Sequence, residues 1–336
     1  MNRRKISLVE IAKQLNTSVS TVSRALNNHP GVNEQLRKKI FDKAEEVGYV
    51  PNSSAISMQS GRKSAIGVIV PNVNRNFFSS AIEGIEEQAY KIGIDIIIAH
   101  SNNSAEREQK IVEMMAGRVD GVIASLSMDK TDHAYYNRLH KIGIPLVLFD
   151  RVADNVISGK VTVDDYAGGL ECTQHLIEQG CRKIFHFAGP QHIQLWERRL
   201  LGYKHAMEQA GLPVERHCIH EQIPTAEFGE EYATHLIAKG NLPDAIFFAG
   251  DYAAVGAMCV FAKHGIRMPE DIAIVGFANE PFCQYLTPQL SSVEQSSFRM
   301  GALSFSMIMD SLSGHSSMDI TIQPQLIVRD SSRRVR

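Results

Sequence analysis

Short apolar runs alternate with longer amphipathic segments from residue 66 to residue 277, and this pattern constrains the fold more than any other feature of the chain. Most of the intervening segments are 12–18 residues long and repeat apolar residues at helical spacing. Buried strands that alternate with helices predict parallel sheets of the doubly wound kind. The runs are Ile66–Val70, Ile94–Ala99, Val119–Ala124, Leu146–Phe149, Ile184–Ala188, Ala245–Ala249 and Ile272–Phe277.

Residues 64–330 are therefore expected to form an α/β body, and their number is enough for two doubly wound parallel-sheet lobes. In such sheets a ligand binds beyond the carboxyl ends of the strands. Polar or aromatic residues follow several of the predicted strands, which makes them candidates for a small-molecule site. They are Phe77, Ser125, Asp150, Trp196, Arg199, Asp251 and Asn279.

Three of these candidates also have a purely structural interpretation. Asp251 precedes a helical segment and is suited to cap it, Asp150 is adjacent to Arg151 and suited to an ion pair, and Trp196 is suited to an apolar core. As ligand-binding residues, Arg199 would hold two hydroxyls or a carboxylate with its guanidinium fork. Trp196 beside it would stack on a sugar ring. The sequence leaves both interpretations open.

The first 50 residues have a different pattern, which predicts three short helices. Ser7 and Asn33 precede two of them as N-cap residues, and the polar stretch Asn16–Ser18 separates the first two. This arrangement is typical of an all-α helix-turn-helix unit, whose second helix enters the major groove of DNA. The apolar positions are Leu8, Ile11, Ala12 and Leu15, then Val19, Val22, Ala25 and Leu26, then Leu36, Ile40, Ala44 and Val47.

The second of these helices carries side chains suited to DNA. Residues 1–63 have a net charge of +6 and the remainder has −8, which suits the head to a polyanion. An arginine can contact guanine O6 and N7 together, and Ser18, Thr21 and Asn27 suit phosphate oxygens. The alternative is that Arg24 pairs with a surface carboxylate such as Glu45. The small or hydrogen-bonding residues between the apolar positions are Ser18, Ser20, Thr21, Ser23 and Arg24.

The stretches Ile6–Ala12, Val19–Asn27 and Gly48–Asn52 closely resemble the head of the lactose-repressor/galactose-repressor family of bacterial transcriptional regulators. The resemblance covers nearly the whole chain and implies a body of two lobes that close on a cleft, as in periplasmic sugar-binding proteins. It implies that the positions of Val19, Ser20 and Arg24 face the bases. The effector contacts that it implies are Phe77, Ser125, Asp150, Arg199 and Asp251.

Residues 51–63 connect head and body, and by themselves they are too short for a stable isolated helix. In the family this segment is a hinge helix that orders on DNA against its dimer mate. The resemblance implies that Met58 wedges into the minor groove and that Ala55 packs beside it, a known way of kinking DNA. Met58 stands where the family has leucine, and the alternative is a plain disordered linker.

The family resemblance also implies a homodimer on a pseudo-palindromic operator, because two readers bind two half-sites with matching symmetry. A carbohydrate is the expected effector class. Two departures weaken any transfer of a particular ligand from known members: Phe277 is followed by Ala278 where sugar-binding relatives have Asp, and Gly250 stands in place of a polar residue.

Several other functions are disfavoured by what the sequence lacks. It has no GxGxxG after a strand and no GxxxxGK[ST], HExxH or GxSxG motif, so an enzyme is not expected. It has no apolar run of membrane-spanning length. Its five cysteines form no CxxC pair, which predicts reduced thiols in a cytoplasmic protein without metal or other cofactor. The alternative function is a solute-binding protein without a transcriptional role, against which the basic head argues.

Overall fold

The computed structural model describes residues 7–26, 29, 31–47, 65–129, 132–240, 242–315 and 318–334. The chain divides into two compact units, a head (Met1–Lys63) and a body (Ser64–Arg336). Three predicted DNA-contact residues, Asn27, Ala55 and Met58, lie outside the described residues, as does the whole hinge segment.

The head consists of three helices, α1 (Leu8–Gln14), α2 (Val19–Leu26) and α3 (Glu34–Glu46). Both predicted N-caps are confirmed: the Ser7 backbone N–H donates to the Glu10 carboxylate (2.9 Å), and the Gln35 N–H donates to Asn33 Oδ1 (2.9 Å). The buried side chains come from all three helices and from the connection before α3, which gives the head a core of its own. They are Ile11, Ala12, Val22, Ala25, Val32, Ile40 and Ala44.

The body contains two parallel sheets, and the predicted fold class is confirmed. Lobe 1, which we define as residues 65–163 and 297–322, holds a six-stranded sheet in the order β11-β5-β4-β3-β1-β2. Its strands are β1 (Ala65–Val70), β2 (Asp95–His100), β3 (Gly121–Ala124), β4 (Leu146–Phe149), β5 (Gly159–Val163) and β11 (Ile320–Ile322). Its helices are α5 (Asn76–Lys91), α6 (Ala105–Ala116), α7 (Asn137–Lys141) and α12 (Ser297–Leu312), with the 3-10 helix η1 (His133–Tyr136).

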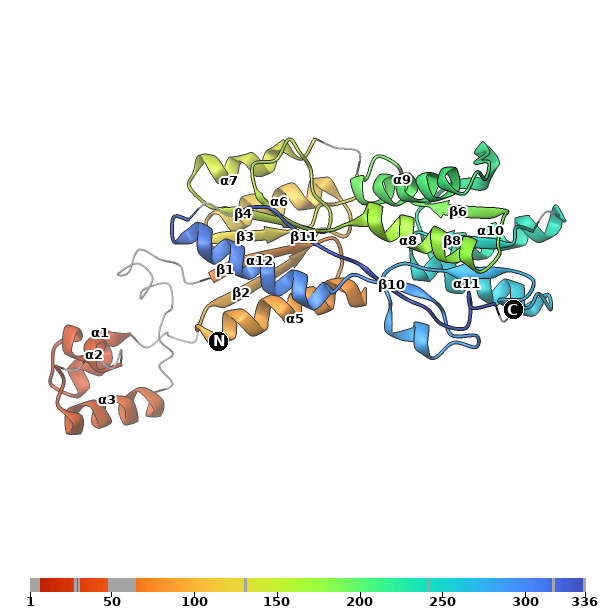
Figure 1. The fold of residues 1–336 in the computed structure, drawn as a ribbon. Helices are drawn as coiled ribbons and strands as arrows, with labels where there is room; N and C mark the ends of the chain where they lie inside the picture. Colours follow the sequence, from red (N-terminus) through yellow and green to blue (C-terminus); the bar gives the residue numbers. More distant parts are fainter. Residues whose placement is uncertain are drawn as a thin grey trace. The chain divides into compact units, whose positions relative to one another are not determined.

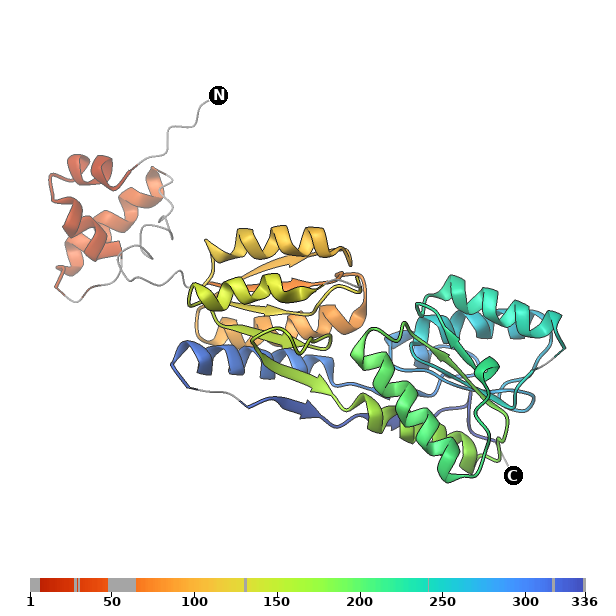
Figure 2. The ribbon, with the colours of Figure 1, turned by 90° about the horizontal axis from the view of Figure 1, so that it is seen from above.

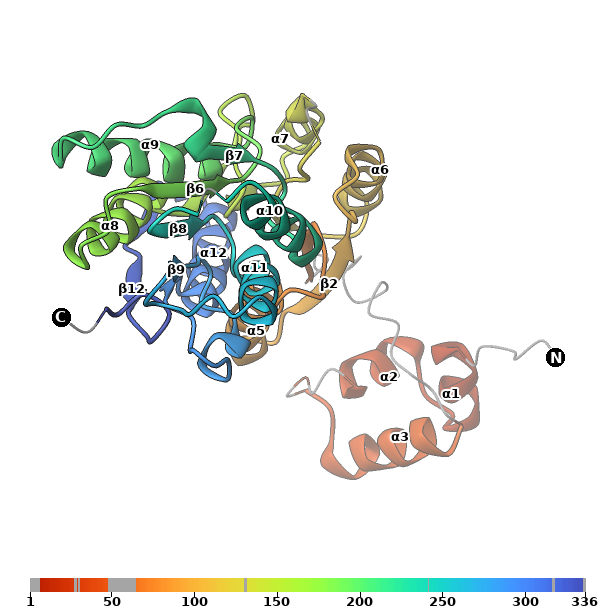
Figure 3. The same ribbon diagram turned by 90° about the vertical axis from the view of Figure 1, so that its right-hand side faces the viewer.

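Lobe 2, residues 164–296 and 323–334, holds a four-stranded parallel sheet in the order β7-β6-β8-β9. Helices α8 and α9 cover one face of this sheet and α10 and α11 cover the other (Figure 3). The strands are β6 (Ile184–Ala188), β7 (Ile219–Glu221), β8 (Ala245–Phe248) and β9 (Ala273–Val275). The helices are α8 (Asp165–Glu178), α9 (Gln194–Gln209), α10 (Ala226–Ala238) and α11 (Asp251–Lys263), with η2 (Arg216–Cys218) and η3 (Pro281–Gln284).

The C-terminal part of the chain completes lobe 1. Helix α12 lies beside α5 although the two are far apart in sequence (Figures 1 and 2), and β11 extends the sheet next to β5. The chain thus passes between the lobes three times. Near two of these passages β10 (Ser292–Glu294) pairs antiparallel with β12 (Gln325–Ile327). Contacts of the body continue past residue 330, because Ser331 and Ser332 are fully buried.

All seven apolar runs form strands, with ends shifted by a few residues. One expectation was wrong in detail: β2 is an edge strand rather than a fully buried one, and Ile98 on it is 46 % exposed. The sequence did not reveal the short or partly polar strands, because three to five residues with few apolar side chains give little periodic signal. These strands are β5, β7, β10 and β11.

Pairs of glycines bring the helices of the body into close contact. On α8 and α9, a Cβ at Gly169 would overlap the carbonyl of Arg199, and one at Gly202 would overlap the carbonyl of Tyr166. Only glycine allows two helix backbones to approach so closely. The same reciprocal arrangement joins α5 to α12 through Gly84 and Gly301, and α10 to α11 through Gly229 and Gly256.

His186, in β6, is fully buried in lobe 2. Its ring stacks on Phe247 and on Tyr203, with ring centroids 4.4 and 5.1 Å away, and Nδ1 lies 2.8 Å from the Phe247 carbonyl oxygen. Burial lowers the pKa of His186 to about 3 because a charged imidazole would be desolvated there. His186 is therefore a core residue of lobe 2, and it does not line the cavity between the lobes.

A histidine held neutral in the folded state makes stability depend on pH. The unfolded chain takes up a proton on this residue below its ordinary pKa of 6.5 and the folded chain does not, so stability is lost as pH falls below that value. Replacing His186 by phenylalanine removes the effect. From about pH 7.5 to about pH 5, the free energy of unfolding of H186F should therefore gain about 2 kcal/mol relative to the parent chain.

Urea unfolding at several pH values, followed by tryptophan fluorescence, measures this difference. The exposed His140, replaced by glutamine, is the control for losing a histidine as such. Parallel pH profiles for H186F and the parent would contradict a neutral His186.

Candidate effector cavity and DNA-reading helix

Helix α2 presents most of its predicted DNA-contact side chains to solvent. Ser20 and Arg24 are exposed, and Val19 is 41 % exposed, so Val19 does not belong to the buried face on which the helical spacing had placed it. Thr21 and Ser23 are half-buried. Arg24 forms no ion pair with Glu45 or with any other described residue. The alternative that the sequence left open, an ion pair of Arg24 with a surface carboxylate, is therefore not observed among the described residues. The guanidinium of Arg24 remains free to contact DNA.

Ser18 organises the start of this helix. Its Oγ accepts a hydrogen bond from the backbone N–H of Thr21 (3.1 Å) and lies 2.7 Å from Thr21 Oγ1 and 2.8 Å from Ser20 Oγ. An N-cap of this kind satisfies a helix N–H that would otherwise lack a partner. Three hydroxyls are thereby gathered at the N-terminal end of α2, where the positive end of the helix dipole favours phosphate.

A cavity of about 260 Å³ lies between the two lobes of the body, at the carboxyl ends of several strands. Five of the seven predicted effector residues line it, and Ser125 and Asn279 do not. The five are Phe77, Asp150, Trp196, Arg199 and Asp251.

Arg199 is nearly fully buried in the cavity wall and is already engaged by the protein. Its Nε and Nη2 each lie 2.8 Å from Asp165 Oδ1, its Nη1 donates to the Ala249 carbonyl oxygen (2.8 Å), and its guanidinium carbon lies 3.6 Å from the ring centroid of Phe277. Among the described residues these bonds leave two of its five N–H groups free. Burial raises the pKa of Asp165 to about 6, although Arg199 acts in the opposite direction.

Asp150 follows β4 and has both of the roles that the sequence suggested. It lines the cavity, and its Oδ2 lies 3.9 Å from Nε of Arg151. Burial raises the pKa of Asp150, while Arg151, Arg199 and the Ser125 hydroxyl beside it act to lower it. Ser125 itself is fully buried near Asp150 and does not line the cavity.

Trp196 also fits both interpretations that the sequence left open, a residue of an apolar core and a residue of the ligand site. It is 5 % exposed and packs in a small apolar cluster with Leu195 and Ala249, yet it is part of the cavity lining. The backbone of Gly189 lies flat against the indole, since a Cβ at that position would overlap the ring. The indole is thus fixed in position in the cavity wall.

Asp251 is not the N-cap of α11, because Gly250 occupies that position. Its carboxylate instead accepts hydrogen bonds from Ser292 Oγ (2.6 Å) and from the Glu280 N–H (2.8 Å). Burial raises the pKa of Asp251. The next candidate, Asn279, is turned away from the cavity: its amide donates to Glu294 (2.8 Å) and accepts from Arg329 (2.8 Å).

The sequence did not single out several residues of the lining, among them Arg75, Arg151, Tyr252 and Glu280. All of them lie within two residues of a candidate, in the polar segments that follow the strands. Proximity to a strand end was thus a signal, but it did not tell which neighbour faces the cavity.

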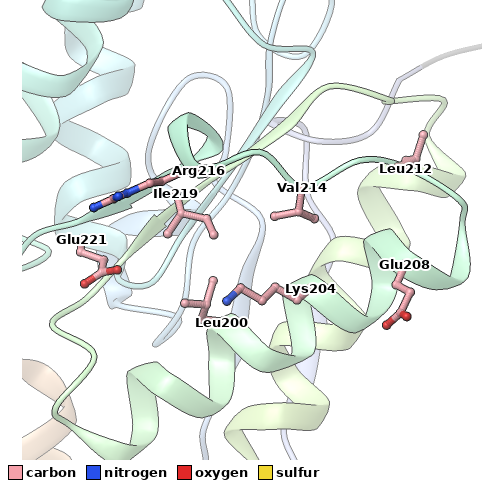
Figure 4. Close-up of a pocket in the computed structure, with 8 residues that line it drawn as sticks. All are labelled: Leu200, Lys204, Glu208, Leu212, Val214, Arg216, Ile219 and Glu221. Atoms are coloured by element: carbon pink, nitrogen blue, oxygen red, sulfur yellow. The ribbon is translucent and has the colours of Figure 1, made fainter.

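A larger hollow of about 860 Å³ lies elsewhere on lobe 2, between α9 and residues 212–221 (Figure 4). Lys204, Glu208, Arg216 and Glu221 at its edges are all exposed, and lobe 1 contributes nothing to it. A second hollow, of about 410 Å³, also lies between the lobes, but none of the seven predicted effector residues lines it. We therefore take the cavity of about 260 Å³ as the candidate effector site. No group of three or more histidine, cysteine or acidic side chains among the described residues is placed to hold a metal ion.

Fold and site define a class of protein: a two-lobed ligand-binding body that carries a helix-turn-helix head. Residues 7–52 match the model of the lacI family of bacterial regulatory proteins, and residues 173–332 match a periplasmic binding protein-like domain. The transcriptional repressor PurR of Proteus mirabilis is 30 % identical over 329 residues, which are 97 % of this chain and 96 % of that protein.

Two solved structures have the same architecture. A lac repressor dimer bound to operator and to an anti-inducer aligns with a TM-score of 0.87 over 98 % of this chain and 99 % of the other, at 21 % identity. A complex of the regulator CelR with cellobiose aligns with a TM-score of 0.74 over 97 % of this chain and 99 % of the other, at 27 % identity.

The chain belongs to the lacI family. It is a DNA-binding regulator of transcription with a small-molecule effector domain, not an enzyme. None of the helices in the described ranges is long and apolar enough to cross a membrane.

Proposed function

We propose that this protein is a cytoplasmic homodimeric repressor that binds a pseudo-palindromic operator, and that a carbohydrate held between the lobes controls this binding. The two α2 helices enter successive major grooves, with Val19, Ser20 and Arg24 at the bases and Ser18, Thr21 and Asn27 towards the backbone. Residues 51–63, with Ala55 and Met58, link effector and operator. A coupling free energy of about 1–3 kcal/mol between the two sites is typical of such regulators.

The observation that carries this proposal is the composition of the cavity between the lobes. Phe77 and Asp150 come from lobe 1, whereas Trp196, Arg199 and Asp251 come from lobe 2. A ligand that touches both lobes binds the closed arrangement more tightly than the open one, and only such differential affinity shifts a conformational equilibrium.

A carbohydrate suits the chemistry of the cavity walls. The rings of Phe77, Trp196 and Tyr252 offer faces for the apolar side of a sugar, and Asp150 and Arg199 offer acceptors and donors for its hydroxyls. The relative that is solved with cellobiose supports the same ligand class. Melting temperatures of the full chain with a panel of neutral mono- and disaccharides test this part, and a panel without any stabilising sugar would reject the carbohydrate assignment.

A second copy of the chain is the proposed partner of the outer edge of lobe 1. Strand β2 ends the six-stranded sheet there, and near it large apolar side chains are exposed, namely Tyr90 (85 %), Ile92 (56 %) and Ile98 (46 %). Exposed apolar groups beside an unpaired sheet edge are typical of an interface. Sedimentation equilibrium of the full chain should give the mass of two chains, and the mass of one would contradict the dimer.

The central experiment is selection of random duplex DNA by the purified protein at near-physiological salt, followed by sequencing. Enrichment of a pseudo-palindrome, with a pyrimidine–purine step at its centre, is expected, because flexible steps are the ones that hinge residues can kink. Enrichment of a single half-site would contradict the symmetric dimer. If no sequence is enriched, even after metabolites are added as possible corepressors, the result would contradict the interpretation of the head as an operator-binding domain.

A further inference from the structure

A second chamber adjoins the effector cavity between the lobes. It is the hollow of about 410 Å³, and two residues, Arg151 and Leu195, line both this chamber and the effector cavity of about 260 Å³. Lobe 1 contributes the segments that follow β3 and β4, and lobe 2 contributes the segment that leads into α9. Because both lobes line it, a movement that brings the lobes together closes the second chamber along with the effector cavity.

The effector cavity by itself is small. Its volume lies below about 300 Å³, the lower end of the usual range for pockets that hold drug-sized ligands. It has room for a single sugar ring, and the second chamber adds room for at least one more. A ligand longer than one ring can therefore be accommodated only if it extends beyond the effector cavity.

The boundary between the two spaces is held in place by the protein. Arg151 donates through Nη1 to Asn103 Oδ1 (2.8 Å), and Leu195 is buried. His192 lines the second chamber and Met128 lines the effector cavity, and Nε2 of the first lies 2.8 Å from the carbonyl oxygen of the second. A ligand that spans both spaces thus rests against side chains that are already ordered, which lowers the entropic cost of binding.

Two carboxylates in the lining of the second chamber come from opposite lobes and are available to a ligand. Asp129 of lobe 1 accepts from the Ala105 N–H through Oδ2 (2.7 Å), which leaves Oδ1 without a partner among the described residues. The side chain of Glu197 in lobe 2 is exposed and forms no hydrogen bond or ion pair with a described residue. Carboxylate oxygens are strong acceptors for hydroxyl groups. A polyhydroxylated ligand that bonds to both carboxylates joins the two lobes.

His133 supplies a third polar group, and its ring is held by its neighbours. It is 8 % exposed, and its Nδ1 lies 3.2 Å from Tyr135 Oη and 3.6 Å from Glu108 Oε1. The Tyr135 hydroxyl donates to the same Glu108 oxygen (2.7 Å). Nε2 of His133 has no partner among the described residues and is left for a ligand. Val152 and Ala153 add apolar surface to the same lining, a combination that suits a sugar ring.

We propose that the second chamber is a second sugar subsite, so that the effector is a disaccharide or a longer oligosaccharide. One sugar unit lies in the effector cavity, the glycosidic bond lies beside Arg151 and Leu195, and the next unit contacts Asp129, His133 and Glu197. The inference rests on the proposed function for the class of ligand, a carbohydrate. It adds the length of that ligand and the residues that recognise its second unit.

Isothermal titration calorimetry of the full chain with matched sugars tests this subsite. The pairs are glucose with cellobiose and with maltose, galactose with lactose, and xylose with xylobiose. For the disaccharide that binds most tightly, Kd should be about tenfold to a hundredfold lower than for its component monosaccharides, because the second ring adds contacts with both lobes at a small ordering cost.

Glu197→Ala removes a hydroxyl acceptor of the second chamber and leaves the lining of the effector cavity intact. It should weaken binding of the disaccharide about fivefold to tenfold and leave binding of the monosaccharide unchanged. Glu208→Ala is the matched control. Glu208 is an exposed glutamate on the same helix, α9, and lines neither space between the lobes, so its replacement should change neither affinity.

Ala153→Phe tests the subsite by filling it. The added ring should occupy the second chamber and reduce the affinity for the disaccharide to that for the monosaccharide. Ala210→Phe adds the same ring at an exposed position of lobe 2 and should leave the difference between the two sugars intact. Because Glu197 is exposed, Glu197→Ala still decides the question if Ala153→Phe fails to fold.

A disaccharide that binds no more tightly than its component monosaccharides would overturn the subsite. An advantage of the disaccharide that survives both Glu197→Ala and Ala153→Phe would overturn it as well. Either result would leave the carbohydrate-controlled regulator in place. If none of these sugars binds, the carbohydrate assignment is rejected and the subsite with it, whereas a normal disaccharide advantage together with failed DNA selection would reject the operator function alone.

Discussion

Replacing Arg199 by alanine should lower the free energy of unfolding of the body by about 3–5 kcal/mol, because it leaves the carboxylate of Asp165 buried without its counter-ion. Asp165 is 9 % exposed and Arg199 is 4 % exposed, so the carboxylate is left largely out of contact with solvent. The contact of the guanidinium with Phe277 is lost as well. Urea unfolding at neutral pH, followed by Trp196 fluorescence, measures the effect.

The neighbouring Arg198 is the matched control, since it is exposed and its replacement by alanine should change stability by less than about 0.5 kcal/mol. Two further results separate the ion pair from packing. Asp165→Asn in the Arg199→Ala background should recover part of the loss. The deficit of Arg199→Ala should also shrink towards about pH 5, where Asp165 becomes protonated. A deficit that is small and independent of pH would show that the pair contributes little.

The expected loss of stability in Arg199→Ala changes how the effector site has to be tested. If Arg199 served only to hold the effector, its loss would abolish the effector response and leave DNA binding intact. The ion pair makes a stability defect an equally direct cause of a lost response. Effector binding should therefore be compared between the Arg199→Met/Asp165→Asn double variant and the parent, at a temperature where both are folded.

Arg24→Ala should weaken binding to the selected operator by about 2–6 kcal/mol per dimer, since each of two half-sites loses a bidentate contact worth about 1–3 kcal/mol. The base preference at one position of each half-site should relax at the same time. Arg24 is exposed on α2 and unpaired among the described residues, so the change should cost the head little stability. Repeated selection and titrations with operator variants measure both effects.

Two further variants separate the effect of the shape of the Arg24 side chain from the effect of its charge. They are Arg24→Lys and Lys38→Ala. Lysine at position 24 keeps the charge but lacks the planar fork, so base preference should still relax while the salt dependence of binding stays nearly unchanged. Lys38 is an exposed cation on α3. Its replacement should leave base preference intact. Unaltered preference in both Arg24 variants would remove Arg24 as a base reader.

Much of the head could be predicted because each local signal agreed with its neighbours. The caps at Ser7 and Asn33 and the apolar spacing specified the same three helices. Val19 shows the limit of this reasoning: the spacing counted it with the buried face, whereas the helix turns it outward. Helical spacing shows which side of a helix is apolar, but it does not show how far around the helix the buried face extends. A residue at the border of that face is therefore assigned poorly.

In the body, the sequence predicted the strand ends that surround the cavity but not the direction of individual side chains there. Asn279 and Glu280 are adjacent, yet the first bonds to Glu294 and Arg329 while the second lines the cavity. The loop that carries them is held by Asp251, through a hydrogen bond between residues 29 positions apart in the chain. Such long-range contacts leave no local pattern in the sequence.

The return of the chain to lobe 1 affects how the protein folds during synthesis. Lobe 1 is the first lobe to leave the ribosome, yet α12 and β11 come from residues 297–322, so this lobe is finished last. At about 5–20 residues per second, β5 waits about 10–30 s for its neighbour β11, and the glycine face of α5 stays uncovered for longer still, about 10–40 s. A nascent or truncated chain therefore exposes an open sheet edge and an apolar helix surface, which are features that chaperones bind and that promote aggregation.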